Sequence, residues 1–276
     1  MTELSDQDAA VASHYDNVIL DYELGRLSRD CPVEYASTIR YLATYVLPGS
    51  VVAEVGVGGG AYTQFLARRG CRLYLADVSQ KLLATTTERL RVSGLSAQIV
   101  LARQASATRL EHIPDAACAS VLLLGPLYHL CSAEDRERAV REAARVLEPN
   151  GMIFAAGINR LGYLRDTFRF SPREGAERRV FHEDFLRNGN LDPAHAPPLG
   201  FAHLTSAAEL RALMSTAFEE VTLVGVESFT NLCQGAIKDL PPEDELAWLD
   251  LVQQTGATPE GLGVSDHFLY IGRKRG

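Results

Sequence analysis

The sequence lacks a long apolar run. Its 276 residues contain no uninterrupted apolar stretch that approaches the ~20 residues of a membrane-spanning helix. The first residues are polar and do not form a charged segment followed by an apolar one, so no secretory leader is expected. We therefore expect a cytoplasmic protein that has no membrane partner.

Cysteine is scarce, and its spacing shows no pairs. The chain has five cysteines, none in a C-x-x-C arrangement, and its seven histidines show no metal-ligand spacing. Disulfide bonds, zinc and other metal sites are therefore not expected. Cys71 and Cys118 fall in or beside apolar strand-like segments, so we expect both thiols to lie in the core.

Positive charge is also scarce. Lys and Arg number 27 against 35 Asp and Glu, a net charge of −8, and the one modest basic cluster is Arg173, Arg178 and Arg179. Contacts to nucleic-acid phosphates require clustered basic side chains, so general nucleic-acid binding is not expected. The 46% hydrophobic content is ample for the core of one large domain or two small ones, and no internal repeat is visible.

What the sequence does contain is an alternation of strand and helix patterns. Short apolar segments predict seven strands, at 51–55, 72–76, 97–101, 119–124, 152–156, 221–226 and 266–272. Amphipathic or capped segments predict helices at 62–68, 79–92, from 132 onward, at 207–217 and at 243–253. This order predicts an α/β fold, a Rossmann-like doubly wound sheet with helices on both faces.

Two further regions accompany the alternating pattern. Residues 6–47 look helical, with Pro32 opening one helix, and they predict an N-terminal helical cover at 1–48 ahead of a main domain at 49–276. From Asn159 to about 201 the pattern is irregular. An irregular segment of that length in a compact domain is typical of a lid or recognition loop, so we expect a lid insertion at about 159–205.

A glycine-rich turn follows the first predicted strand. Residues 56–60 contain four glycines between that strand and a helix, which is the context of a dinucleotide-type binding motif. Gly56, Gly58 and Ala61 also satisfy the NAD version of the motif, so the glycines leave the ligand open. Glu54 favours a ligand with an ammonium group over NAD. A carboxylate about 4–6 Å from a pyrophosphate repels the pyrophosphate by roughly a kcal/mol or more, whereas the same carboxylate attracts an ammonium group. S-adenosylmethionine carries an ammonium group and no phosphate.

A second acidic residue ends the next strand. Asp77 stands 21 residues after Gly56, close to the spacing at which an acid binds ribose hydroxyls in βαβ units. Glu54 and Asp77 would then hold the two ends of one ligand. The alternative is that both carboxylates cap the helices that follow them.

Together these motifs resemble class I S-adenosylmethionine-dependent methyltransferases. The resemblance rests on the glycine turn with Glu54, on Asp77, on the segment LLLGPLYHL at 122–130 and on the Pro-Asn-Gly turn at 149–151, and it covers roughly 50–157. It implies a sheet whose final strand is antiparallel, with S-adenosylmethionine as cofactor and S-adenosylhomocysteine as product. A bacterial subgroup with a helical N-terminal cover is the nearest type.

The resemblance also assigns cofactor-binding residues. They are Glu54, Gly56, Gly58, Gly60, Asp77, Val78, Leu124 and Gly125, with Val78 against the adenine. The chain departs from the family after the third strand, where Ser106 replaces an aspartate that is common in the family. We expect the Ser106 hydroxyl to accept a weak hydrogen bond from the adenine amino group. Tyr15, on an N-terminal helix, is a candidate for covering the pocket, and core packing is the alternative.

Catalytic candidates lie just past the fourth strand. Open α/β sheets bind ligands at the carboxyl ends of their strands, which is where Tyr128 and His129 fall. His129 is the candidate general base because the pKa of histidine lies near neutrality. The alternative is that both side chains only pack the loop. Asn159 and Arg160 follow the fifth strand and either face a substrate or belong to an exposed polar loop.

The sequence therefore predicts a methyltransferase that transfers a methyl group from S-adenosylmethionine to a small-molecule acceptor by in-line displacement. The alternatives are an RNA or protein methyltransferase, a non-catalytic S-adenosylmethionine-binding protein and a nicotinamide oxidoreductase. The acceptor atom, the use of a general base and the oligomeric state stay open at this point.

Overall fold

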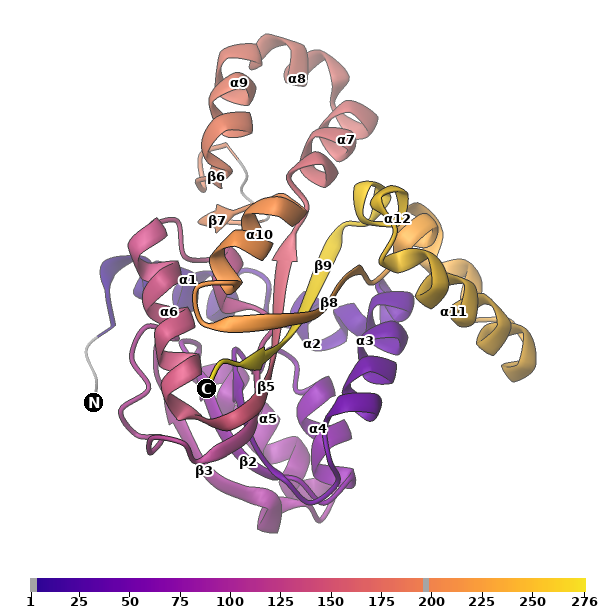
Figure 1. Ribbon diagram of the computed structural model, residues 1–276. Helices are drawn as coiled ribbons and strands as arrows, with labels where there is room; N and C mark the ends of the chain where they lie inside the picture. The colour runs from indigo at the N-terminus through magenta and orange to yellow at the C-terminus, as the bar shows by residue number, and fades with distance from the viewer. Residues whose placement is uncertain (1–3, 196–198) are drawn as a thin grey trace.

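The computed structural model describes residues 4–195 and 199–276. Its centre is a seven-stranded sheet with the order β3-β2-β1-β4-β5-β9-β8 (Figure 1). The strands are β1 (Val51–Val55), β2 (Arg72–Asp77), β3 (Ile99–Gln104), β4 (Cys118–Leu123), β5 (Leu147–Ile158), β8 (Phe218–Gly225) and β9 (His267–Lys274). Strands β1 to β5 are parallel, and β9 runs antiparallel between β5 and β8. The predicted α/β sheet with an antiparallel final strand is confirmed.

Helices cover both faces of the sheet. On one face, α6 (Ala133–Val146) and α10 (Ala207–Met214) share a core with Ala53 and Val55 of β1. On the other, α3 (Pro32–Tyr45), α4 (Ala61–Arg68) and α5 (Gln80–Val92) share a second core with Val52. Successive side chains of a strand point to opposite faces, so a strand buried on both faces is apolar throughout. This explains why β1 is apolar at every position except Glu54.

Serine side chains fix the start of three of these helices. The hydroxyl oxygens of Ser79, Ser132 and Ser206 each accept a hydrogen bond from the backbone N–H three residues later. Each bond satisfies one of the N–H groups that a helix start leaves unpaired. At Ser206 the Glu209 side chain also accepts from the Ser206 N–H, which completes a capping box.

Three helices precede the sheet. They are α1 (Asp6–Asn17), α2 (Leu20–Arg29) and α3, and they confirm the helical pattern expected for 6–47. Pro32 is the first residue of α3, a position where the missing N–H costs no hydrogen bond. Helix α1 packs against α2 and α5, and α2 packs against α3.

Residues 159–205 contain more regular structure than the sequence indicated. Helices α7 (Arg160–Phe170), α8 (Pro172–Glu177) and α9 (Arg179–Asn188), with the short strands β6 (Asn190–Leu191) and β7 (Ala202–His203), form an arm that projects from the sheet (Figure 1). The expectation of an irregular segment was wrong. Asn159 and Thr205 pair as an isolated bridge, so the arm begins and ends at one place beside β5. Residues 196–198 of the expected lid lie outside the described residues.

Several other boundaries differ from the prediction. β3 begins at Ile99 because a 3-10 turn, η1 (Ser96–Gln98), precedes it. β5 begins at Leu147, so the turn at 149–151 lies within the strand and not before it. The sequence did not predict η3 (Ser228–Ile237) or α12 (Pro259–Val264). In chain order, η3 lies between β8 and α11 (Pro242–Gly256), and α12 lies between α11 and β9.

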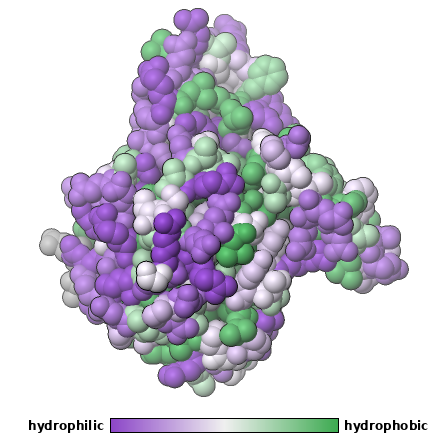
Figure 2. Space-filling view, in the orientation of Figure 1, coloured by the Kyte–Doolittle hydropathy of each residue, from purple (hydrophilic) through white to green (hydrophobic). Residues whose placement is uncertain are grey.

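Apolar side chains are not confined to the core. Cys71 and Cys118 are fully buried, as predicted. On the arm, however, Phe168, Phe170 and Val180 are exposed, and Figure 2 shows hydrophobic residues among hydrophilic ones on this projection. In the described part of the chain, no helix combines the length and apolar character that crossing a membrane requires.

Candidate functional site

The turn after β1 uses backbone conformations that glycine adopts readily. Gly56, Gly58 and Gly60 have φ angles of 80°, 49° and 77°. Neighbouring segments also leave no room for a side chain on the turn, because a Cβ on Gly56 would lie 2.8 Å from Cδ of Pro126. A Cβ on Gly59 would lie 2.9 Å from a main-chain oxygen of α2. The turn therefore exposes bare backbone to segments that approach it closely, as a nucleotide-type turn requires.

A cavity opens beside this turn, and we call it the glycine-turn cavity. The turn, the ends of β2 and β4, and helices α1 and α2 form its walls. Ten of the predicted site residues line it: Tyr15, Gly56, Gly58, Gly60, Asp77, Val78, Leu124, Gly125, Tyr128 and His129. Parallel strands end at the same edge of a sheet, which is why residues so far apart in the chain meet here. Glu54 and Ser106 are the two predicted residues outside the lining.

Asp77 both organises the turn and faces the cavity. Its Oδ1 accepts from the Ser79 N–H at 2.8 Å, and its Oδ2 accepts from the Gly58 N–H at 3.3 Å. Burial raises the pKa of Asp77 to about 6, although these backbone donors favour the charged form. Ser79 caps α5 and Gly60 precedes α4, so helix capping does not account for Asp77, whose carboxylate orders the turn and faces the cavity.

Glu54 lies behind the cavity wall. Its side chain is buried, and its Oε2 has no hydrogen-bond partner among the described residues. Burial, with a smaller effect of Asp77, raises the pKa of Glu54 to about 8. A buried carboxylate without a partner is costly, so a cation near the turn would stabilise its charged form. An ammonium ligand, bound directly or through water, fits this orphaned oxygen.

Ser106 turns away from the cavity. Its hydroxyl lies 2.9 Å from the hydroxyl of Thr108, and it lines a small separate cavity. Its neighbours Ala105 and Ala107 line the glycine-turn cavity in its place. The geometry thus leaves this stretch without a polar side chain toward the cavity, so backbone groups are what it can offer to an adenine.

His129 uses both ring nitrogens in contacts within the protein. Its Nδ1 lies 2.9 Å from the carbonyl oxygen of Phe201, and its Nε2 lies 2.8 Å from the hydroxyl of Tyr15. A carbonyl only accepts, so Nδ1 carries the proton and Nε2 accepts from Tyr15. Burial lowers the pKa of His129 to about 4, despite the bond to Phe201. His129 is therefore a neutral group that fixes Tyr15, and Tyr128 packs beside it with ring centroids 5.0 Å apart.

A second cavity, which we call the outer cavity, lies on the other side of this pair. Its volume is ≈ 710 Å³, and its walls come from α1, α2, the arm and the start of β9. Tyr15, Glu23, Arg26, Tyr128 and His129 line both cavities. The outer cavity is within the size range of small-molecule sites and adjoins the glycine-turn cavity through these shared side chains.

Asn159 and Arg160 serve the base of the arm. Asn159 caps α7 and donates to the carbonyl oxygen of Ser265 at 2.8 Å. Arg160 donates to the carbonyl oxygens of Leu186 and Leu204 and to Glu209. Both side chains are buried, so neither belongs to an exposed loop, and neither lines the outer cavity.

The sequence did not identify three polar residues of the glycine-turn cavity. Asp8 comes from α1, and Glu23 and Arg26 come from α2. One signal was present, because Glu23 and Arg26 are three residues apart and therefore share a helix face. The structure places that face on the glycine turn, where Glu23 lies within contact distance of a Cβ on Gly58.

Comparisons with known proteins agree with this geometry. Residues 53–155 match a family model described as a methyltransferase domain. A ubiquinone biosynthesis O-methyltransferase from Methylococcus capsulatus is 33% identical over 177 residues, which cover 59% of this chain and 72% of that protein.

Solved structures resemble the whole chain in fold. The cyclase SpnF aligns with a TM-score of 0.59 and 18% identity over 99% of this chain and 98% of its own. The N-methyltransferase NodS from Bradyrhizobium japonicum, solved with S-adenosylhomocysteine, aligns with a TM-score of 0.54 and 17% identity over 92% and 96%. At these identities the likeness establishes the fold.

Proposed function

This chain belongs to the class I S-adenosylmethionine-dependent methyltransferases, and we propose that it methylates a small-molecule acceptor held in the outer cavity. The observation that supports this choice is the outer cavity, which shares five lining residues with the glycine-turn cavity. The name of the Methylococcus relative, an O-methyltransferase of ubiquinone biosynthesis, also favours a small acceptor. A net charge of −8 favours neither RNA nor an acidic protein as substrate.

We propose the following contacts for the cofactor, whose sulfonium supplies an activated methyl group. Asp77 accepts from the ribose hydroxyls, and Val78 packs against the adenine. Glu54, one residue before the wall of the cavity, attracts the ammonium group. Arg26, which also lines the cavity, adds a positive charge for the carboxylate of the same amino-acid end. The fit rests on the orphaned oxygen of Glu54 and on the carboxylate of Asp77 in the cavity wall.

The protein's own part in the transfer is mainly positioning. In-line displacement needs the two reacting atoms about 3–3.5 Å apart in a site without competing water. Tyr15, Tyr128 and His129 form the boundary between the cavities, so they set where an acceptor atom can approach. We propose that residues 1–48 and the arm at 159–205 act as the covers of the acceptor.

Calorimetry with three ligands tests the proposed function. S-adenosylmethionine and S-adenosylhomocysteine are expected to bind, because both carry the ammonium group that the Glu54 carboxyl favours. NAD is expected to bind at least about tenfold more weakly, since it has no ammonium group to stabilise the charged form of Glu54 and its pyrophosphate disfavours that form. Tight NAD binding without a response to the other two ligands would overturn the proposal.

His129→Ala tests the boundary between the cavities. The Tyr15 hydroxyl loses its acceptor, so we expect turnover to fall at least about tenfold while cofactor affinity stays within about threefold. Steady-state kinetics and calorimetry measure the two effects. Tyr15→Phe is the matched variant, because it removes only the hydroxyl of the same hydrogen bond. Full activity of His129→Ala would leave the histidine with a packing role alone.

A further inference from the structure

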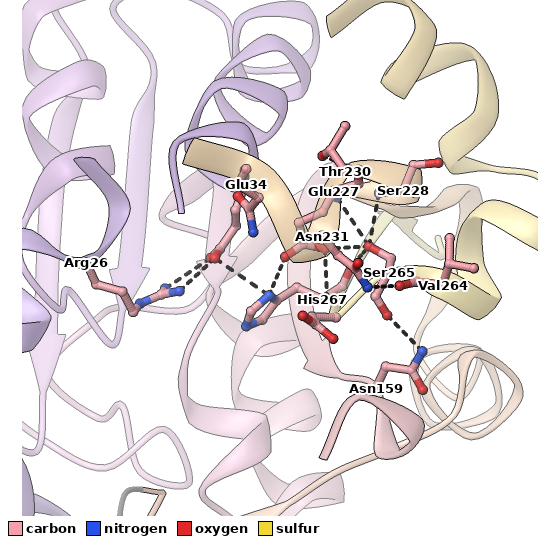
Figure 3. Close-up of polar contacts among 12 residues, drawn as sticks. Arg26, Glu34, Asn159, Glu227, Ser228, Thr230, Asn231, Val264, Ser265 and His267 are labelled. Carbon is pink, nitrogen blue, oxygen red and sulfur yellow. Dashed lines mark hydrogen bonds and ion pairs between the residues drawn. The ribbon is translucent and has the colours of Figure 1, made fainter. Parts of the chain in front are cut away.

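Four charged side chains stand in a row where the N-terminal helices meet β9 (Figure 3). Arg26 of α2 makes two hydrogen bonds to Glu34 of α3, at 2.6 and 3.0 Å. An oxygen of Glu34 lies 3.6 Å from Nδ1 of His267, the first residue of β9. That same nitrogen lies 2.5 Å from Oε1 of Glu227. The row therefore alternates in sign along Arg26, Glu34, His267 and Glu227.

Glu227 is held in one orientation. It is fully buried, and its Oε2 accepts from the backbone N–H of His267 at 3.0 Å and from the hydroxyl of Ser265. Its Oε1 is left to accept from the imidazole. Because a carboxylate only accepts, the ring proton sits on Nδ1. A neutral His267 therefore has its basic lone pair on Nε2.

Nε2 of His267 is the ring nitrogen that the two carboxylates leave available to a ligand. Figure 3 shows the second ring nitrogen turned away from both carboxylates, and every hydrogen bond recorded for the ring among the described residues is made by Nδ1. His267 lines the outer cavity with a side chain that is 20% exposed. His129 differs, because both of its ring nitrogens are already bonded.

A metal ion is a poorer fit to the same residues. One ligand-type atom from each of Glu34, Glu227 and His267 lies within 4.8 Å of the others. However, the guanidinium of Arg26 already binds both oxygens of Glu34, and the hydroxyl of Ser265 already binds Glu227. A divalent ion would have to displace these cationic and donor groups. The arrangement is better suited to holding a proton than a metal.

We propose that Nε2 of His267 takes the proton from an acceptor hydroxyl, and that the acceptor is an aromatic hydroxyl compound. The inference rests on the proposed function. The O–H bond breaks and an N–H bond forms at Nε2. The electron pair freed on oxygen forms the new bond to the methyl carbon. The bond between sulfur and the methyl carbon breaks, and its electron pair stays on sulfur. The imidazolium later returns its proton to water.

The walls of the outer cavity support an aromatic acceptor. Tyr22 and Tyr163 line it together with the shared Tyr15 and Tyr128, and Ile158 adds an apolar surface. Aromatic rings pack well against such faces and edges. A ring bound there carries its hydroxyl in a cavity that also contains the imidazole of His267.

The surrounding charges suit a phenol in particular. Burial alone would lower the pKa of His267, but Glu34 and Glu227 outweigh burial and the opposing Arg26, and they raise it to about 9. Asp266, the residue before His267, forms an ion pair with Arg165. Burial raises the pKa of the nearby Cys31 thiol to about 12, so this thiol stays neutral. Phenolic hydroxyls ionise near pH 10, so the proton moves between groups of similar affinity.

The test compares acceptors that differ in acidity. The wild-type protein is assayed by S-adenosylhomocysteine formation with phenol, catechol and para-nitrophenol as a function of pH. With phenol, the rate is expected to rise with pH up to about 9, the value to which the carboxylates raise the pKa of His267. His267→Gln is expected to lower kcat for phenol about a hundredfold or more. It is expected to lower kcat for para-nitrophenol, which ionises without help, by less than about tenfold.

Two variants separate a proton-transfer role from a structural one. Glu227→Gln removes one carboxylate beside the imidazole, so the rising limb of the pH profile is expected to move to lower pH. His112→Gln, in the loop between β3 and β4 and in the lining of neither cavity, is the matched histidine control and is expected to keep wild-type rates. Visible absorbance supplies a readout apart from activity, because the wild-type protein is expected to bind para-nitrophenol as its phenolate more strongly than His267→Gln does.

Each outcome decides the proposal. Equal losses for the three acceptors in His267→Gln, or a pH profile unchanged in Glu227→Gln, would show that His267 takes no proton. If a protein that binds S-adenosylhomocysteine methylates none of the three, the acceptor class is wrong while the proposed function stands. A protein that binds neither S-adenosyl compound would refute the proposed function itself. If His267→Gln does not fold, the contrast between phenol and para-nitrophenol in the wild-type pH profiles decides.

Discussion

Replacing Arg26 by alanine is expected to lower the free energy of unfolding at neutral pH by about 3–5 kcal/mol. The side chains of Arg26 and Glu34 are only 15% and 9% exposed, and the guanidinium donates to both carboxylate oxygens. Removing it leaves a buried carboxylate that must either stay charged without this partner or take up a proton. Urea unfolding followed by circular dichroism measures the change.

A second arginine of α2 is the matched control. Arg29 pairs with Asp30, but the two side chains are 55% and 39% exposed. Water screens such a pair, so Arg29→Ala is expected to change the unfolding free energy by at most about 1 kcal/mol. Losses of similar size in the two variants would contradict the claim that burial makes the Arg26 pair important.

The pH dependence of the Arg26 effect has a definite sign. Burial alone would raise the pKa of Glu34, but Arg26 and His267 hold it below its ordinary value of 4.5. A carboxyl with a lowered folded-state pKa adds stability above its unfolded pKa, and this stability is lost as pH falls through the folded value. The difference between wild type and Arg26→Ala should therefore be fully present above about pH 4.5 and shrink below it.

The sheet was predictable because local patterns determine it. The mostly apolar strands β1 and β4 are buried on both faces, and the glycines at 56–60 mark the turn between strand and helix. These signals occupy a few consecutive residues and need no knowledge of distant segments. The ends of the strands then placed Asp77 and the 124–129 segment at one edge.

The arm was not predictable by the same means. Its helices are short, and Pro172 and the left-handed Gly189 interrupt the pattern that a longer helix would show. A small core that includes Phe185, Leu191 and Leu204 brings them together. Short helices depend mostly on tertiary packing, so their own periodicity is weak.

The candidate site also has one part that the sequence predicts and another that it does not. Asp77 and the glycines lie next to strand ends, but Arg26, Glu34, Glu227 and His267 come from opposite ends of the chain. No spacing rule connects residues that are two hundred positions apart. Burial also changed the expected chemistry of His129, since the carbonyl of Phe201 and the hydroxyl of Tyr15 occupy both of its nitrogens. The sequence shows that a histidine is there, and only the packed structure shows what it contacts.

Asp77→Ala is expected to weaken binding of S-adenosylhomocysteine by at least tenfold and by up to about a hundredfold, because hydrogen bonds to a charged acceptor contribute about 1.5–3 kcal/mol. The fold should persist, since Ser79 still caps α5. Calorimetry supplies the affinity, and Asp77→Asn is the matched variant of equal size. Because burial raises the pKa of Asp77 to about 6, wild-type affinity should be highest above that pH and fall below it as the carboxylate protonates. Asp77→Asn cannot titrate there, so its affinity should be low and nearly flat over the same range. Wild-type affinity in Asp77→Ala would place the ribose elsewhere, and a flat wild-type profile would mean that the ligand does not bind the charged form of Asp77.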